Sequence, residues 1–125
     1  MRGLIKINVE DIIIYRRKRV NHSDYRYGGW YLIYNRKTNR GYVGKSIEYM
    51  FRLRQHLLIK NPKTLIDIEL KANPDDFDYF LIDSYANKEI NFFNRENEMI
   101  IESALIGKFK TNFPLGYNNR HYEHV

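Results

Sequence analysis

Two short segments rich in aromatic and β-branched residues constrain the fold of this chain more than any other feature. The segments Trp30–Asn35 (WYLIYN) and Tyr42–Ser46 (YVGKS) have compositions typical of β-strands. Between them, Arg36–Gly41 is polar and contains Asn and Gly, which tolerate the backbone angles of a tight turn. The pattern predicts an antiparallel hairpin. Because side chains alternate along a strand, Tyr31 is expected on the face opposite Trp30.

A helical pattern follows the hairpin directly. Apolar side chains recur at helical spacing over Ile47–Lys60, and Ser46 is a suitable N-cap for this helix. Within it, Arg52 and His56 are four residues apart and are expected on one face. A second helix is expected in the segment TLIDIELKAN at 64–73, which a proline ends.

The second half of the chain predicts one more strand and one long helix. The strand is expected over Phe77–Ala86, and the helix begins at Asn91 or Asn94 and runs to Lys110. The side chains expected to face inward from this helix are Met99, Ile100, Ala104, Leu105 and Phe109. The order of elements predicts an α+β fold, with a small three-stranded antiparallel β-sheet flanked by helices.

Composition narrows the class of protein. A chain of 125 residues with 43% hydrophobic residues fits one folded domain. The absence of cysteine excludes a disulfide framework and a thiolate zinc site. No apolar run reaches the roughly 20 residues that a membrane span requires. We therefore expect a soluble, intracellular (cytoplasmic) protein with no membrane partner.

Charge is distributed unevenly along the chain, whose net charge is +6. Residues 35–60 carry seven Lys or Arg and a single acidic residue, whereas residues 61–102 carry four Lys or Arg and ten acidic residues. A basic half of this kind is typical either of a phosphate-binding face or of a solvated surface. The side chains expected to contact DNA are Arg16, Arg17, Lys18, Arg19, Arg36, Lys37, Arg40 and Arg54.

The basic run at Arg16–Arg19 lies in an N-terminal segment that precedes the hairpin. A basic arm of this kind often follows a phosphate backbone. Alternatively, the segment forms an extra strand or helix on the edge of the fold with its charges in water. The sequence leaves both interpretations open.

Five short motifs occur in a fixed order along the chain. They are GWY at Gly29–Tyr31, YVG at Tyr42–Gly44, Arg52 with His56, Glu102 in the last helix, and GYN at Gly116–Asn118. In order and spacing they resemble the motifs of the GIY-YIG nuclease family, although Trp30 replaces the usual isoleucine of the first motif. On this resemblance we expect a nuclease domain at residues 28–119, preceded by a basic extension at 1–27 and followed by a tail at 120–125.

The resemblance implies a set of catalytic residues: Tyr31, Tyr42, Arg52, His56, Glu102, Asn118 and Lys45. Glu102 would hold Mg²⁺ or Mn²⁺, with Glu98 as its rival on the same helix. The motifs contain one carboxylate, so a two-metal site is not implied. The planar guanidinium of Arg52 is suited to hold the phosphate and to neutralise its growing charge.

The same resemblance assigns the attack of water to the two motif tyrosines. Tyr42 would act as the base, and Tyr31 would position the water. The pKa of tyrosine is ordinarily near 10, so the base needs a positive charge nearby, which Lys45, Arg52 and the metal would supply. His56 would orient the tyrosines or contact phosphate, and Asn118 would fix the site by hydrogen bonds.

The function that these residues predict is a Mg²⁺-dependent DNA endonuclease of phage, mobile-element (homing) or restriction origin, with a repair or branched-DNA nuclease less favoured. It would act on DNA as a monomer or as a DNA-induced dimer, because one active site cuts one strand at a time. The alternative is a nucleic-acid-binding module that has kept the fold and lost cleavage. The presence of Arg52 and Glu102 favours the enzyme.

Overall fold

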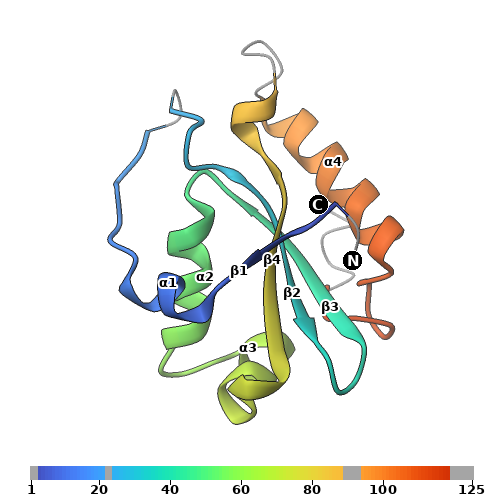
Figure 1. Ribbon diagram of the computed structural model, residues 1–125. Coiled ribbons are helices and arrows are strands. Elements are labelled where there is room, and N and C mark those ends of the chain that lie inside the picture. The colour runs from blue at the N-terminus through green and yellow to red at the C-terminus, as the bar shows by residue number, and fades with distance from the viewer. Residues whose placement is uncertain (1–2, 22–23, 89–93, 119–125) are drawn as a thin grey trace.

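The computed structural model describes residues 3–21, 24–88 and 94–118, and its centre is an antiparallel sheet of four strands (Figure 1). The strands are β1 (Ile5–Ile7), β2 (Gly29–Asn35), β3 (Arg40–Ser46) and β4 (Phe77–Ser84). Their order across the sheet is β1-β4-β2-β3. The predicted α+β class and the hairpin of β2 and β3 are therefore confirmed, and β3 is an edge strand.

The fourth strand comes from the N-terminal segment. Strand β1 pairs with β4, with Ile5 opposite Leu81. The sheet therefore has four strands rather than the three expected. The sequence did not predict β1 because this segment is too short and too exposed to show a strand pattern. Part of the N-terminal segment, Ile5–Ile7, thus forms the extra edge strand that one of the two interpretations expected. The DNA-binding role of Arg16–Arg19 and the domain division at residue 28 stay predictions.

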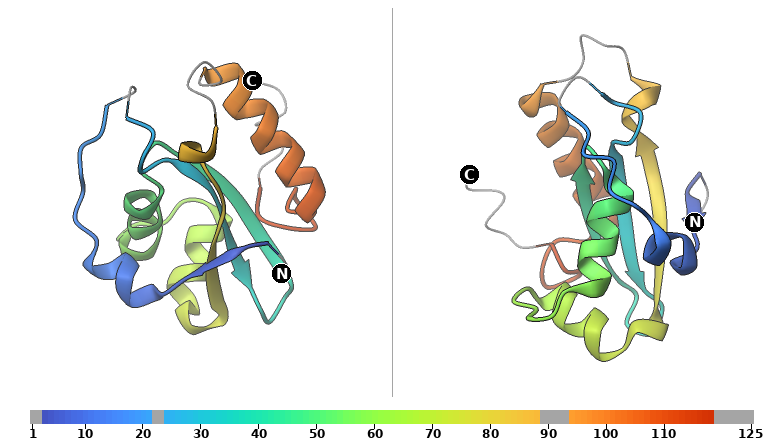
Figure 2. Two further views of the ribbon diagram at one scale, coloured as in Figure 1. Left: turned by 45° about the horizontal axis from the view of Figure 1, so that its top comes forward. Right: turned by 90° about the vertical axis from the view of Figure 1, so that its left-hand side faces the viewer.

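Helices lie on both faces of the sheet (Figure 2). One face carries α1 (Val9–Ile14), α2 (Tyr49–Leu58) and α3 (Leu65–Ala72), and the other carries α4 (Arg95–Phe109). Two short 3₁₀ helices flank β4, at Pro74–Asp76 and Tyr85–Asn87. Across the described parts of the chain, no helix has the length and apolarity that a bilayer crossing requires.

The predicted N-cap at Ser46 is wrong. Helix α2 begins at Tyr49 with Glu48 at the N-cap position, and Ser46 instead accepts a hydrogen bond from the Glu48 backbone at 3.0 Å. The second helix has the cap that its sequence favours, since Thr64 accepts a hydrogen bond from the Asp67 backbone. Asn94 caps α4 in the same way, whereas the rival start at Asn91 lies outside the described residues.

The main core fills the space between the sheet and the helices α2 and α3. Tyr31 and Ile33 of β2 pack there with Leu53 of α2 and with Ile66 and Leu70 of α3, and each is at most 2% exposed. Burying an aliphatic side chain of this size contributes about 1.5–3 kcal/mol. This layer therefore fixes the position of α2 relative to the hairpin.

The opposite face is covered less completely. Trp30 is fully buried there, against the ring of Tyr85 at 4.7 Å between centroids. No side chain of α4 is fully buried, and Ile100 is 58% exposed. The expectation that Ile100 and Ala104 face inward is wrong, because α4 packs mainly against the edge strand β3 and leaves much of its surface in solvent.

Candidate active site

Tyr31 of β2 lies directly opposite Gly44 of the neighbouring strand β3. The two residues are paired in the register of β2 and β3, and a Cβ atom at position 44 would stand 2.3 Å from Cζ of Tyr31. Glycine is thus the one residue type that allows the ring to lie so close to the backbone of β3. This close contact explains why the last residue of the YVG motif is glycine. It also directs the Tyr31 hydroxyl toward α2.

A buried chain of hydrogen bonds starts at this hydroxyl. The oxygen of Tyr31 lies 3.0 Å from Nε2 of His56, and Nδ1 of His56 lies 2.6 Å from Oδ1 of Asp67. The side chains of His56 and Asp67 are 2% and 8% exposed. Residues from β2, α2 and α3 are therefore joined in one polar network inside the core.

The charge state of Asp67 follows from these neighbours. Burial acts to raise the pKa of this carboxyl, but the hydrogen bond from His56 and the electrostatic interaction with its ring oppose the rise, helped by Thr64 and Arg52. The net effect is a pKa below the ordinary range of aspartate. Asp67 is therefore a carboxylate at neutral pH.

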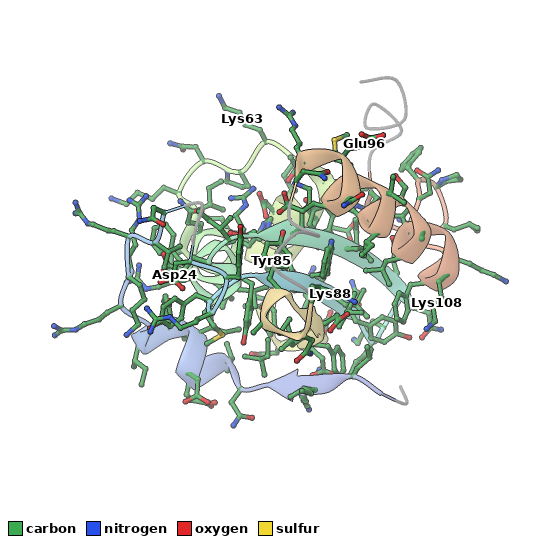
Figure 3. All side chains as sticks on the ribbon, turned by 90° about the horizontal axis from the view of Figure 1, so that it is seen from above. Asp24, Lys63, Tyr85, Lys88, Glu96 and Lys108 are labelled. Carbon is green, nitrogen blue, oxygen red and sulfur yellow. The ribbon has the colours of Figure 1, made fainter. Side chains whose placement is uncertain are left out.

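A pocket of about 400 Å³ opens beside this network. Tyr42, Arg52, His56 and Asp67 line it, and the remaining walls are Lys63, Thr64, Leu65, Ile66, Phe113 and Tyr117. The ring of Tyr42 stands edge-on to His56 at 5.5 Å and 6.4 Å from the ring of Tyr31. Figure 3 shows Lys63 extending outward, on the side of the molecule away from the pale blue N-terminal segment.

The structure thus brings together four of the seven predicted catalytic residues. Tyr42 and Arg52 are accessible from the pocket, whereas Tyr31 is 1% exposed and reaches the pocket through His56. Arg52 is exposed, and its guanidinium contacts Gln55 at 3.4 Å. A phosphate-sized anion in this pocket would therefore meet Arg52 and the Tyr42 hydroxyl region.

Glu102 and Lys45 belong to the other face of the sheet. Lys45 follows Gly44 on β3 and so points toward α4, where its positive charge acts on Glu102. Burial raises the pKa of Glu102, Lys45 lowers it and the nearby Glu98 raises it, with a net rise. Glu102 does not line the pocket of Tyr42 and Arg52.

Glu98, the rival ligand, lies one helical turn before Glu102. It lines a second pocket of about 430 Å³ with Lys45 and Tyr85, and its backbone oxygen accepts a hydrogen bond from Trp30 at 3.3 Å. Both carboxylates therefore lie on the sheet-facing side of α4. Within the described ranges, no three His, Asp or Glu side chains cluster as a metal site.

Asn118 closes the free edge of β3. Its amide oxygen accepts a hydrogen bond from the Val43 backbone and its amide nitrogen donates to the Val43 carbonyl, each at 2.8 Å. Nearby, the Tyr117 backbone donates to the Gly41 carbonyl at 2.8 Å. Asn118 is 1% exposed, and its buried amide makes the two hydrogen bonds to Val43 that the backbone of a further strand would make.

The basic run Arg16–Arg19 is held against α2. The buried carboxylate of Glu48 accepts hydrogen bonds from the Tyr15 hydroxyl at 2.8 Å and from the Lys18 backbone at 2.6 Å. The guanidinium of Arg17 lies 4.7 Å from the centre of the Phe51 ring. Four basic side chains are thus exposed along a segment that the fold anchors.

The other basic residues predicted to contact DNA differ in their surroundings. Arg36 forms an ion pair with Asp78 at 2.6 Å, and Arg54 donates to the Ile13 carbonyl at 3.1 Å. Lys37 is exposed in the hairpin turn and Arg40 is half-buried at its end. Arg36 and Arg54 therefore have structural partners that a phosphate would have to share or displace.

Two polar residues of this region escaped the sequence analysis. Asp67 lies eleven positions after His56 and in a different helix, so no local spacing links them. Glu48 had a signal, because it is the single acidic residue in the basic stretch 35–60. An isolated acid among so many cations points to an internal partner.

Comparison with known proteins places these observations in a family. The family model described as the GIY-YIG catalytic domain matches residues 27–118, which include every motif described above. The comparisons with curated proteins and with solved structures found no match.

Proposed function

The chain belongs to the GIY-YIG catalytic domain family, which makes it a nuclease, and on this premise we propose that it is a divalent-metal-dependent DNA endonuclease. The observation that carries the proposal is the pocket in which Tyr42 and Arg52 lie beside the buried pair of His56 and Asp67. A pocket with one guanidinium, one accessible phenol and a buried imidazole suits a phosphodiester better than a neutral substrate.

Arg52 is proposed to bind the scissile phosphate. Its side chain is exposed at the pocket, and its planar fork donates two parallel hydrogen bonds to phosphate oxygens. The attack of water adds negative charge to those oxygens, so the same contacts become stronger in the transition state. Arg52 therefore contributes both to binding and to rate.

Tyr42 is proposed to act as a phenolate, which takes one proton from the attacking water and becomes a neutral phenol. The hydroxide then forms a bond to phosphorus while the bond to the leaving oxygen breaks, and that oxygen is protonated by solvent. The burial of Tyr31 supports a different role from the one expected, because its hydroxyl is directed at His56 rather than into the pocket. We propose that Tyr31 positions the site through His56.

Glu102 is proposed to hold the metal ion. Its carboxyl has a raised pKa because it is partly buried and close to Glu98, and a cation bound there would offset both effects. Mg²⁺ uses one or two carboxylates and several waters, so these residues fit it or Mn²⁺. When bound, the ion supplies charge neutralisation for the phosphate and the leaving oxygen.

The edge position of β3 would allow side chains from both faces to reach one substrate. Tyr42 and Lys45 project from opposite faces of this strand, and the described parts of the chain add no strand beyond it. The loop of Tyr117 and Asn118 covers β3 at Gly41–Val43. We propose that a DNA strand crosses the remaining end of β3 and contacts the basic run Arg16–Arg19.

A plasmid-nicking assay with Mg²⁺ or Mn²⁺ tests this function. We expect Glu102→Ala and Arg52→Ala to reduce nicking by at least about 100-fold, in line with the loss of about 2.7 kcal/mol of transition-state stabilisation. Glu96→Ala is the matched control for Glu102, because Glu96 is an exposed acid of the same helix. Cutting by Glu102→Ala at the wild-type rate would contradict the metal assignment.

Tyrosine variants test the base. Tyr42→Phe is expected to lose nicking, whereas Tyr34→Phe, on the same sheet outside the pocket, is expected to keep it. A wild-type protein that binds DNA but never cuts it would instead support the binding-module alternative. Sequencing the ends left on randomised duplex DNA would report the specificity and the stagger of the two cuts. The phage, mobile-element or restriction origin and the cytoplasmic location stay predictions.

A further inference from the structure

We propose that Asp67 is a positioning residue of the active site, which holds His56 in one tautomer and one orientation toward Tyr31. The inference rests on the proposed nuclease function for its effect on rate. It concerns a residue that none of the family motifs contains. The carboxylate, the imidazole and the phenol come from α3, α2 and β2, so tertiary packing alone brings them together.

The direction of the hydrogen bonds follows from the chemistry of the groups. An ionised carboxylate only accepts hydrogen bonds, so Nδ1 of His56 must carry a proton and donate it to Asp67. A neutral imidazole then has a lone pair on Nε2, which accepts the hydroxyl proton of Tyr31. Asp67 therefore fixes the donor-to-acceptor direction of both hydrogen bonds, from Tyr31 to His56 and from His56 to Asp67.

Stability alone is a weak reason for such a pair. Removing an imidazole and a carboxylate from water is costly, and two apolar side chains of similar volume would often fill the same space with equal or greater stability. The pair also lines the pocket that contains Tyr42 and Arg52, so the negative charge of Asp67 acts where the reaction occurs. Buried ionisable groups at a pocket are typical of functional sites.

The orientation of His56 matters because the ring is a wall of the pocket. It contacts Tyr31 and Tyr42 edge-on, at 6.0 and 5.5 Å between ring centres. A ring released from Asp67 would be free to turn, and an imidazole with its proton on Nε2 would donate to Tyr31 instead of accepting from it. The Tyr31 proton would then have to point elsewhere, toward the groups that surround Tyr42.

Four charged or titratable side chains line the pocket beside the pair of His56 and Asp67. They are Arg52 of α2, Tyr42 of β3, Lys63 just before α3, and Tyr117 after α4. Arg52 is the cation whose charge acts on Asp67. Replacement of Asp67 by a neutral group therefore leaves the positive charge of Arg52 without this opposing charge.

The kinetic test is Asp67→Asn in the full chain, assayed on plasmid and on a short duplex substrate. We expect kcat to fall about 10- to 100-fold with KM changed less than about 3-fold, as for other residues that orient a catalytic group. Glu69→Gln is the matched control, since Glu69 lies on the same helix and also accepts a tyrosine hydrogen bond, from Tyr117 at 2.8 Å. It should keep kcat within about 3-fold of wild type.

The spectroscopic test does not depend on activity. The ¹⁵N chemical shifts of His56, assigned with His56→Gln, should show a protonated Nδ1 and an unprotonated Nε2 in the wild type, and Asp67→Asn should lose this pattern. A wild-type spectrum with the proton on Nε2 would overturn the proposal, as would unchanged kcat in a folded Asp67→Asn protein. If the wild type cuts no DNA, the nuclease proposal fails, while the ¹⁵N shifts still decide the role of Asp67.

Discussion

Replacement of Gly44 by alanine tests the close packing between Tyr31 and the edge strand. The new Cβ would stand 2.3 Å from Cζ and 2.4 Å from the hydroxyl oxygen of Tyr31. The ring is buried and its hydroxyl is held by His56, so neither partner has room to move. Overpacking of a core costs about 1–3 kcal/mol. Alanine recovers about 0.4–1 kcal/mol by restricting the unfolded chain, so the middle of the two ranges leaves a net loss of about 1.3 kcal/mol.

Gly107→Ala provides a control with the opposite sign. Gly107 lies within α4 and a Cβ there would have no neighbour within 4 Å. Alanine is favoured over glycine in a helix by about 0.5–1 kcal/mol, so this variant should be more stable than the wild type. Urea unfolding followed by circular dichroism measures both free energies. A Gly44→Ala protein as stable as the wild type, beside a stabilised Gly107→Ala protein, would refute the proposed packing.

Three further substitutions test other parts of the structure. Asn118→Ala should cost about 2–4 kcal/mol in urea unfolding, because it leaves a buried backbone donor and acceptor of β3 unpaired. Glu102→Gln should raise the unfolding free energy at pH 7, because the pKa of Glu102 is raised in the folded state and folding therefore disfavours its ionised form. Thermal unfolding should show this gain disappear as the pH falls to about 4, where the carboxyl becomes protonated in the unfolded chain as well. Tyr15→Phe should cost about 1–2 kcal/mol and speed trypsin cleavage within Arg16–Arg19, since Glu48 loses one of its hydrogen bonds to the arm; unchanged cleavage would contradict the anchor.

Local features of the sequence were enough to predict the central hairpin and the helix after it. The alternation around Tyr31 and the polar turn depend on neighbouring residues alone, and the structure has both strands in the expected pairing. The same is true of Asn94, one of the two expected starts of the last helix, whose side chain caps α4 by binding the backbone three residues later. Short-range rules predict these elements because the interactions that form them are themselves short-range.

The features that the sequence did not show depend on distant partners. Ser46 has the chemistry of an N-cap, but the nearby carboxylate of Glu48 is committed to Tyr15 and the helix starts later. Ile100 fits the apolar side of a helix, yet α4 covers only part of the sheet and leaves this residue exposed. The role of Asp67 depends on its hydrogen bond to His56, which lies on another helix, so the local sequence around Asp67 does not indicate it.

The pairing of the first strand with β4 has a consequence for how the chain acquires its structure. During synthesis Ile5 leaves the ribosome early, but its partner Leu81 follows only after the hairpin, α2 and α3 have been made. Contacts that join distant positions form late, because a long loop must close before they contribute any free energy. We therefore expect the hairpin to form before the N-terminal strand docks. Until then the outer edge of β4 is open to pairing with other chains, which makes this strand the first place where newly made protein would aggregate.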